Sequence, residues 1–337
     1  MIDTDRRRGR QPEETAYQQI RDVLRRGRTF LLTTHCDPDG DGLGAELALG
    51  EALAQLGKSA HIVNSDRVPP QYHFLAGNKI IQRYSARAHQ SLFSTCDVAV
   101  LLDAIRPERT GRLAPALESF PGIKVAIDHH GPGGWASLEL SDETAVSTTQ
   151  VVYDLLCELP VKMGPNVAGY LFTGLVTDTN GFRTPNVSPR VLRLAAGLIG
   201  AGASHEEVCR AIFASWSMGC VRVLGTFLAR LNTAARGRVV WGVVRREDLR
   251  KYRCRPVQID RFAEEALRVG TATIAMVFVE EPLQTVRVSF RSRPGVRVDH
   301  LARSFGGDGH PQSAGTRMKG DIESVVVRVV RKARIAA

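Results

Sequence analysis

The sequence has 337 residues but no long apolar segment. A membrane-spanning helix needs roughly 18 or more consecutive apolar residues, and no run in this chain approaches that length. The N-terminal letters MIDTDRRRGRQPEET are rich in basic residues, yet no apolar stretch of the kind that marks a secretory signal follows them. We therefore expect a cytoplasmic protein that does not act at a membrane.

The sequence also lacks paired cysteines, internal repeats and low-complexity tracts. Its six cysteines are Cys36, Cys96, Cys157, Cys209, Cys220 and Cys254. Zinc knuckles and secreted disulfide frameworks depend on closely spaced cysteine pairs, and no CxxC pair occurs here. We therefore expect all six side chains to be reduced thiols.

Acidic residues are scarce in the C-terminal part of the chain. Residues 220–337 contain 23 Lys and Arg against 11 Asp and Glu, a net charge of +12, whereas residues 1–219 contain 22 against 24, a net charge of −2. Clustered basic side chains attract phosphate groups through long-range, salt-sensitive electrostatics. The charge asymmetry alone is compatible both with a polyanionic partner and with a surface that merely keeps the protein in solution.

The length predicts two domains, because a single hydrophobic core rarely grows beyond about 250–300 residues. In the first part, short apolar runs alternate with helical patterns, which predicts an α/β domain with a parallel sheet and flanking helices. The predicted strands are residues 29–34, 60–64, 97–102 and 123–127. The predicted helices are residues 17–26, 43–56, 148–156, 166–177 and 189–201, the third of them capped by Thr148 or Thr149.

The second part is predicted to be a smaller α+β domain. A mostly helical connector, residues 206–236, ends where Gly237 interrupts the pattern. The expected strands are residues 239–244, 271–280, 285–293 and 324–330, and the expected helices are residues 259–269 and 298–305. Pro282 predicts a turn that joins the second and third of these strands into an antiparallel hairpin.

Three strands of the first part end in residues that bind metal ions. The first strand runs into HCDPDGDGLG, residues 35–44, which contains a histidine and three carboxylates. The third strand is followed by Asp103, and the fourth by the triplet Asp-His-His at residues 128–130. Functional sites in open α/β sheets lie at the carboxyl ends of the strands, so we expect one crevice to collect these side chains.

A further acid, Asp178, ends an apolar helical run, and Gly181 after it permits a sharp turn. Carboxylate oxygens with a few imidazoles suit manganese or magnesium better than zinc. One divalent ion would leave much of the negative charge unbalanced, whereas two ions about 3.5–4 Å apart that share a carboxylate would balance it. Such a pair supports the hydrolysis of phosphate esters.

These segments together resemble the DHH phosphoesterase family. The family motif HxxPDxD corresponds to residues 35–41, an isolated acid stands at Asp103, the name-giving triplet occupies residues 128–130, and TDTxGF corresponds to residues 177–182. All four motifs occur in the family's order. The resemblance implies a catalytic domain at residues 17–205. Residues 1–16 before it are expected to be a basic, flexible tail, because chain termini are commonly disordered, and a binding arm is the alternative.

The resemblance also implies roles for individual residues. The first metal ion is assigned to His35, Asp39 and Asp103. The second is assigned to Asp41, Asp103, His129 and Asp178, so that Asp103 bridges the two ions. Asp128 is implied to orient or support the site, and His130 to contact phosphate and protonate the leaving oxygen. The implied cofactor is a pair of Mn²⁺ ions, with Mg²⁺ as the alternative.

Residues 305–310, FGGDGH, and the following SAG resemble the GGGGH…AAG loop of the DHH-associated C-terminal domain, here residues 237–337. The resemblance implies substrate binding by Gly306, Gly307, Gly309 and His310. Glycines let backbone amides approach phosphates closely. Asp308 stands where the family has glycine, and an acid beside a phosphate is electrostatically unfavourable, so the affinity of this loop for substrate is left open.

The segment TVRVSFRSR, residues 285–293, contains three arginines in a strand pattern. Alternation places Arg287, Arg291 and Arg293 on one face of the strand. The family pattern VSxRS implies a substrate-binding role for Arg291. Arg287 and Arg293 are equally compatible with substrate contact and with an ordinary solvent face.

The two-domain length is similar to the bacterial group that degrades oligoribonucleotides and dephosphorylates 3'-phosphoadenosine 5'-phosphate (pAp). This resemblance implies that the partners are short single-stranded RNA or nucleotide phosphates, and that the protein is a homodimer. The alternatives are a RecJ-like single-strand exonuclease, a phosphodiesterase acting on cyclic or linear dinucleotides, and, outside the enzymes, a nucleic-acid-binding protein on a degenerate phosphoesterase fold.

Overall fold

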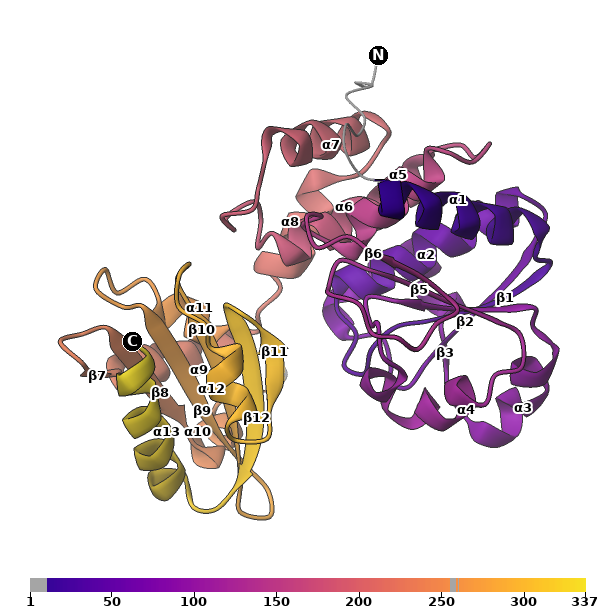
Figure 1. The fold of residues 1–337 in the computed structure, drawn as a ribbon. Helices are drawn as coiled ribbons and strands as arrows, with labels where there is room; N and C mark the ends of the chain where they lie inside the picture. The colour runs from indigo at the N-terminus through magenta and orange to yellow at the C-terminus, as the bar shows by residue number, and fades with distance from the viewer. Residues whose placement is uncertain (1–10, 255–258, 260) are drawn as a thin grey trace. The chain divides into compact units, whose positions relative to one another are not determined.

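The computed structural model describes residues 11–254, 259 and 261–337, and it divides into two compact units, Met1–Ser215 and Trp216–Ala337. Each unit contains its own sheet (Figure 1). Residues 1–10 of the predicted tail lie outside the described residues. The remainder of that tail is helical, because α1 (Gln11–Arg26) begins at residue 11, where proline and glutamate in the first turn favour a helix start.

The first unit is built on a parallel sheet with the strand order β3-β2-β1-β4-β5-β6. The strands are β1 (Thr29–Thr33), β2 (Ser59–Asn64), β3 (Gln82–Arg83), β4 (Val98–Leu102), β5 (Ile123–Asp128) and β6 (Leu138–Ser141). The predicted parallel sheet is thereby confirmed. Its four central strands are the four that the apolar runs indicate, and the two edge strands are additions that the sequence did not predict.

Helices cover both faces of this sheet. They are α2 (Gly40–Gln55), α3 (Ala86–Thr95), α4 (Ala114–Glu118), α5 (Thr148–Leu156), α6 (Pro165–Asp178), α7 (Pro189–Gly200) and α8 (His205–Phe213). Phe30 and Leu32 of β1 are buried in the core that contains α1, α2, α5 and α6, whereas Leu31 faces the core of α3 and α4. Figure 1 shows these two groups of helices on opposite sides of the sheet.

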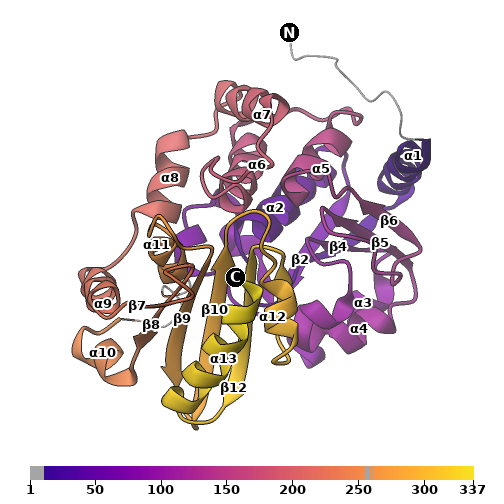
Figure 2. The ribbon, with the colours of Figure 1, turned by 60° about the vertical axis from the view of Figure 1, so that its left-hand side comes forward.

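Three short 3₁₀ helices, η1 (Pro70–Tyr72), η2 (Ala76–Ile80) and η3 (Pro107–Leu113), lie in the connections of the first unit. Helix α8 packs against α6 and η1 and therefore belongs to the first unit, as Figure 2 also shows. Helix α9 (Met218–Ala229) packs against elements of the second unit. The segment that the sequence assigns to a connector, residues 206–236, is thus divided between the two units.

The second unit contains a mixed sheet with the order β11-β12-β10-β9-β8-β7. The strands are β7 (Asn232–Ala234), β8 (Val239–Val244), β9 (Ile274–Glu281), β10 (Thr285–Ser292), β11 (Asp308–His310) and β12 (Ser313–Lys319). Only β8 and β9 pair in parallel. The hairpin predicted at Pro282 is confirmed, because β9 and β10 pair in antiparallel register across Leu283 and Gln284, which adopt positive φ angles.

The faces of the second sheet bury separate cores. On β9, Met276 and Phe278 face the core covered by α12 (Asp299–Arg303) and α13 (Ile322–Ala336), while Val277 faces the core of α9, α10 (Arg246–Lys251) and α11 (Phe262–Ala266). Figures 1 and 2 show α13 lying along this sheet.

The prediction of a strand at residues 324–330 is wrong, because this segment forms most of α13. Its valines favour a strand by propensity, but the buried residues recur with helical spacing at Ile322, Val325, Val329 and Ala333. Asp321 caps the helix by accepting a hydrogen bond from the backbone amide of Ser324. The strand that pairs with β10 is instead β12.

Among the described residues, no single helix is long and apolar enough to cross a membrane; only α8 and α9 taken together across their break reach the required length and composition. All six cysteines lie within the described residues and are free thiols. None of them forms a disulfide bond in the structure, and their reduced state stays a prediction.

Candidate metal centre

The parallel sheet brings the predicted acids and histidines together at the carboxyl ends of its central strands. Strands β1, β4 and β5 are neighbours in the sheet, and their carboxyl ends lead into His35, Asp103 and Asp128. Asp103 follows β4 with a φ angle of 55°, a left-handed conformation that aspartate tolerates better than most residues, and its amide donates to the carbonyl of Ile127 on β5. The turn therefore directs the Asp103 carboxylate between the neighbouring strand ends.

His35, Asp39 and Asp103 form a first group of side chains able to hold a metal ion, with ligand atoms within 4.8 Å of one another. His35 Nε2 lies 3.3 Å from Asp103 Oδ2 and 3.9 Å from Asp39 Oδ1. Asp39 also caps α2, because its Oδ1 accepts the backbone amides of Asp41 and Gly42 at 2.9 and 3.2 Å. The cap fixes one carboxylate oxygen beside the imidazole.

Asp41, His129 and Asp178 form a second group. His129 Nε2 lies 3.1 Å from Asp178 Oδ2 and 3.7 Å from Asp103 Oδ1. Because the other oxygen of Asp103 is the one beside His35, this carboxylate lies between the two groups. One oxygen of Asp103 thus faces each group.

The amino end of α5 holds Asp41. The backbone amides of Thr148 and Thr149 donate to its Oδ2 and Oδ1 at 2.6 and 2.9 Å, and Thr149 Oγ1 donates to Oδ1 at 2.7 Å. The sequence suggested only that one of these threonines caps the helix, but the cap is Ser147, whose hydroxyl accepts the amide of Gln150. The threonines instead orient site acids, since Thr148 Oγ1 also lies 3.2 Å from Asp103 Oδ1.

Asp128 positions the adjacent histidines. Its Oδ1 accepts the backbone amides of His129 and His130 at 2.7 and 3.1 Å and lies 2.5 Å from His130 Nδ1. The hydroxyl of Ser141 on β6 donates to the carbonyl of His130. Asp128 is fully buried and lies in a further group with Asp103 and both histidines. These contacts fix the orientation of the His130 ring.

Helix α6 and the loop after it place Asp178. Asn180, Gly181 and Phe182 all have positive φ angles, between 48° and 67°, so the chain turns sharply after the helix. A Cβ on Gly181 would lie 3.2 Å from the Phe213 ring of α8. Phe182 packs near the Phe172 ring of α6, with ring centroids 6.2 Å apart. The predicted turn at Gly181 is present, and it is packed between two helices.

The electrostatics of the cluster favour cations. Burial and the negative charge of Asp103 raise the pKa of Asp41 to about 7. Burial and the charge of Asp41 likewise raise the pKa of Asp178 well above its usual value. Burial lowers the pKa of His35 and of His129, but hydrogen bonds to neighbouring carboxylates outweigh it and hold both pKa values well above the usual range. Protons partly compensate the excess of carboxylates, and divalent ions would compensate it more fully.

The donor set fits the ions that the sequence predicts. Carboxylate oxygens with a few imidazole nitrogens suit manganese and magnesium, and zinc sites built on thiolates would need cysteine ligands. Cys36, the cysteine next to His35, is exposed and belongs to none of the three groups among the described residues. The acidic and imidazole side chains of this cluster could therefore hold divalent metal ions.

In the second unit, Arg291 lies on β10 with its Nε 3.5 Å from Glu264 Oε1 of α11. Arg287 Nε lies 3.2 Å from Glu281 Oε1. Arg293 donates to the backbone carbonyls of Ala272, Leu267 and Val269. Arg293 therefore stabilises the end of α11 and the segment after it, which favours a structural role for this arginine.

The glycine-rich loop runs between α12 and β11. A Cβ on Gly307 would lie 2.1 Å from the carbonyl oxygen of Gly315, and Gly306 and Gly309 have φ angles of 75° and 146°. These glycines are therefore required by the backbone geometry itself. The side chains of Asp308 and His310 lie outside the described part of the structure, although their backbones pair with Gly315 and Ser313.

The register relates the loop to Arg291. Ser313 on the central strand β12 pairs with His310 on one side and with Arg291 on the other. Arg291 and His310 therefore occupy one row across three strands, separated by two strand spacings, or about 10 Å. The two predicted substrate-binding positions share one end of the sheet.

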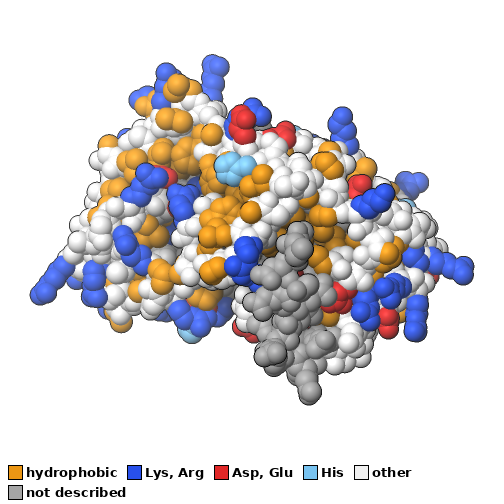
Figure 3. Space-filling model, turned by 90° about the horizontal axis from the view of Figure 1, so that it is seen from above, with side chains coloured by type: hydrophobic (Ala, Val, Ile, Leu, Met, Phe, Trp, Pro, Cys, Tyr) orange, Lys and Arg blue, Asp and Glu red, His pale blue; other side chains and the backbone are white. Residues whose placement is uncertain are grey.

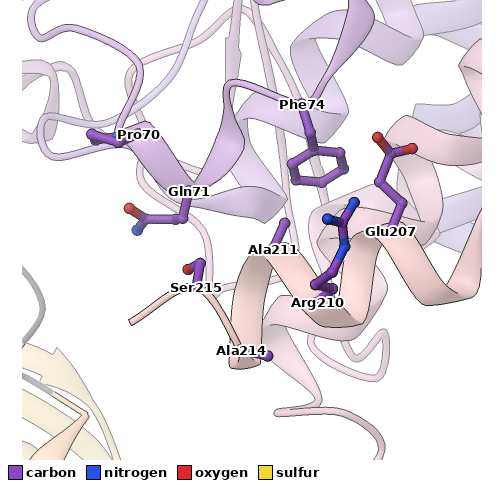
Figure 4. A pocket seen from close by; sticks show the side chains of 8 residues that line it. All are labelled: Pro70, Gln71, Phe74, Glu207, Arg210, Ala211, Ala214 and Ser215. Carbon is purple, nitrogen blue, oxygen red and sulfur yellow. The ribbon is translucent and has the colours of Figure 1, made fainter. Parts of the chain in front are cut away.

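Other surface features do not coincide with the cluster. A shallow pocket of about 330 Å³ lies between η1 and α8, lined by Pro70, Gln71, Phe74, Glu207, Arg210, Ala211, Ala214 and Ser215 (Figure 4). None of its lining residues is a predicted ligand. On the face drawn in Figure 3, the visible Lys and Arg side chains of the described residues are scattered rather than gathered into one basic patch.

Comparison with known proteins adds two domain matches. Residues 29–175 match the DHH family, N-terminal domain, and residues 236–333 match the DHHA1 domain. The chain is 31% identical over 341 aligned residues to the bifunctional oligoribonuclease and PAP phosphatase NrnA of Thermus thermophilus, with 97% of each chain covered.

Two solved structures are similar in fold. An exopolyphosphatase-related protein from Bacteroides fragilis has a TM-score of 0.90 and 22% identity and covers 95% of this chain and 96% of its own. RecJ from Thermus thermophilus in complex with Mn²⁺ has a TM-score of 0.57 and 15% identity, covering 97% of this chain and 54% of RecJ. At these identities the likeness concerns the fold alone.

Proposed function

This chain belongs to the DHH family and carries a DHHA1 domain as its second part, and on that premise we propose that it is a manganese-dependent phosphoesterase. Its substrates are short oligoribonucleotides, which it hydrolyses to 5' mononucleotides, and pAp, which it dephosphorylates. The observation that carries the proposal is the convergence of the three ligand groups at one sheet edge, with Asp103 between them. The full-length match to a relative named for both activities supports it.

We further propose that residues 17–205 are the catalytic domain, residues 206–236 the connector and residues 237–337 the substrate-binding domain. One ion is held by His35, Asp39 and Asp103, and the other by Asp41, Asp103, His129 and Asp178. When bound, such ions supply Lewis acidity and neutralise charge on a phosphoryl group attacked by water. Every ligand atom in this assignment belongs to one of the groups described above.

His130 acts as general acid on the leaving oxygen, and Asp128 is its positioning partner. The short contact between His130 Nδ1 and Asp128 Oδ1 fixes the ring, and the carboxylate stabilises the protonated imidazole. Burial raises the pKa of Asp128, but the hydrogen bond and the charge of His130 outweigh it and hold this pKa below its usual value, so Asp128 stays ionised. The ionised carboxylate keeps its hydrogen bond to the His130 ring.

Arg291, Gly306, Gly307, Gly309 and His310 bind the substrate in this proposal. Arg291 must then exchange Glu264 for a phosphate, and the 3.5 Å separation of its Nε from Glu264 Oε1 makes this ion pair easy to replace. The backbone amides of the glycine-rich loop supply further donors. We also propose that the protein is a homodimer, which sedimentation equilibrium would test.

The test is hydrolysis of a 5'-labelled RNA dinucleotide, a long single-stranded RNA and pAp, each with Mn²⁺, with Mg²⁺ and with a chelator. We expect cleavage of the dinucleotide and of pAp with Mn²⁺, and none with chelator. Asp103→Ala should abolish turnover. The control is Asp97→Ala, because the Asp97 carboxylate accepts the backbone amides of Arg28 and Thr29 at the beginning of β1, at the opposite end of the strands from the ligand groups.

Other results would favour other functions. Cleavage of the long RNA alone would favour a RecJ-like exonuclease. Salt-sensitive RNA binding without any metal-dependent turnover would favour a nucleic-acid-binding protein on this fold. Either result would contradict the proposed activity.

A further inference from the structure

Glu46 is a fully buried acid that none of the roles above uses. It lies on α2, one helical turn after Gly42, with no solvent exposure. Its Oε2 accepts a hydrogen bond of 2.8 Å from Asn64 Nδ2, while its Oε1 has no hydrogen-bond partner among the described residues. Burying a carboxyl group with one partner is unfavourable, so the position calls for an explanation beyond packing.

Asn64, the last residue of β2, extends the sheet by one side-chain hydrogen bond. Its Oδ1 accepts the backbone amide of Thr34 and the hydroxyl of Thr33, both at 3.3 Å. Strand β1 ends at Thr33, so the amide of Thr34 is the first one beyond the strand. The next residue is His35, and the side chain of Asn64 therefore fixes the backbone that carries this histidine.

The orientation of the Asn64 amide depends on Glu46. The Thr34 amide is a donor, so the carbonyl end of the Asn64 side chain must face it, and the NH₂ end must face an acceptor. Glu46 supplies that acceptor. Reversal of the Asn64 side chain would set two donors against each other and release the backbone before His35.

We propose that Glu46 and Asn64 are positioning residues that hold His35 in place for a divalent metal ion. The proposal rests on the proposed function, because it takes His35 as a ligand. Close packing supports it: a Cβ on Gly42 would lie 2.2 Å from Thr34 Oγ1, so α2 and the end of β1 leave little room for the backbone to adjust in another way.

The electrostatic environment of Glu46 agrees with this role. Burial raises its pKa to about 8, although the hydrogen bond from Asn64 and the charge of His35 lower it. Glu46 is thus largely a neutral acid near pH 7. It can accept a hydrogen bond from Asn64 without adding a full negative charge to the core near the ligands. Glutamine would preserve the same acceptor.

The test exchanges donor and acceptor between the two side chains. The titrations are run well above the Glu46 pKa of about 8, because a protonated Glu46 would itself donate a hydrogen bond to a new carboxylate. In Asn64→Asp, one carboxylate oxygen can still accept the Thr34 amide, but the other then faces the ionised Glu46 carboxylate. In the double variant Glu46→Gln, Asn64→Asp, the new amide can donate to the new carboxylate, so the hydrogen bond is restored in reverse. Glu46→Gln alone preserves an acceptor for Asn64.

Mn²⁺ affinity of the full chain, measured by isothermal titration, is the main readout, and circular dichroism checks the fold of each variant. Loss of a supporting contact around metal ligands weakens metal binding by about 10–100-fold. We expect losses in this range for Asn64→Asp and Glu46→Ala, a small change for Glu46→Gln, and recovery of most of the affinity in the double variant. Gln55→Ala is the control, because Gln55 also lies on α2 and bonds to Lys162 far from the ligands.

Wild-type affinity in both Asn64→Asp and Glu46→Ala would overturn the proposal. So would an equal loss in Asn64→Asp and in the double variant, since a pair that only fills the core gains nothing from the restored hydrogen bond. The affinities do not depend on the identity of the substrate. If the wild-type chain binds Mn²⁺ but cleaves neither RNA nor pAp, the proposed activity fails and the positioning role is still decided by the titrations.

Discussion

Replacing Gly174 by alanine should displace Asp41 and so weaken metal binding. Gly174 lies in α6, and a Cβ at this position would lie 2.4 Å from Thr149 Oγ1 and 2.5 Å from Asp41 Oδ1. Real Cβ atoms do not approach this closely, so either the Asp41 carboxylate or the start of α5 must shift. Both carry the hydrogen bonds that orient Asp41.

The magnitude follows from two opposing effects. Alanine stabilises a helix interior by about 1 kcal/mol relative to glycine. Overpacking of a close-packed core costs about 1–3 kcal/mol. We therefore expect Gly174→Ala to lower the free energy of unfolding by up to about 2 kcal/mol, and a displaced Asp41 to weaken Mn²⁺ binding by about 10-fold or more.

The control is Gly169→Ala in the same helix. A Cβ on Gly169 would have no neighbour within 4 Å, so only the helix propensity changes and stability should rise. Urea unfolding and Mn²⁺ titration of both variants provide the comparison. Equal stability and equal affinity in Gly174→Ala and Gly169→Ala would refute the account of how α6, Thr149 and Asp41 pack together.

Three further predictions concern charge and capping. Without metal, Asp103→Asn should be more stable than the wild type, because the substitution removes a charge that raises the pKa of Asp41. The variant should also lose the stabilisation of about 2.7 kcal/mol that Mn²⁺ at 100 times its Kd gives the wild type. Thermal melts with and without Mn²⁺ measure both effects. The hydrogen bond from Arg297 lowers the pKa of Asp299 to about 2. Asp299 therefore stabilises the fold above its unfolded pKa of about 3.9, and this stabilisation is lost as the pH falls towards 2. The difference in Tm between wild type and Asp299→Asn should be large at neutral pH and shrink in acid, and a constant difference would contradict this. Ser147→Ala should cost about 1 kcal/mol in urea unfolding through loss of the α5 cap, whereas an unchanged midpoint would show that the cap contributes nothing.

The sequence predicted the parallel sheet because its central strands are uninterrupted apolar runs, as in β4, where every residue is buried. It did not predict β3, which has two residues, both exposed, and so carries no hydrophobic signal. The mistaken strand at residues 324–330 has a different origin. Several valines in succession have high strand propensity, and only the burial provided by tertiary packing selects the helix α13.

The candidate ligands could be found because their residue types are unusual at the ends of buried strands. The residues that support these ligands could not be found from the sequence. Thr149 stands 108 positions from Asp41, to which it donates, and Asn64 stands 30 positions from Thr34. A threonine in the first turn of a helix and an asparagine at the end of a strand are common in any protein, so only the three-dimensional contacts reveal what they hold.

The ligands are also distributed along the chain in a way that bears on its synthesis. The groups draw on His35, Asp103, His129 and Asp178, so no short segment contains a complete set. During translation the N-terminal strands leave the ribosome first, but the second group lacks a ligand until the end of α6 has emerged. In the proposed assignment the first group is complete once Asp103 has been synthesised, whereas the second ion can bind only after Asp178 has been added, so a nascent chain truncated before Asp178 would lack the second site.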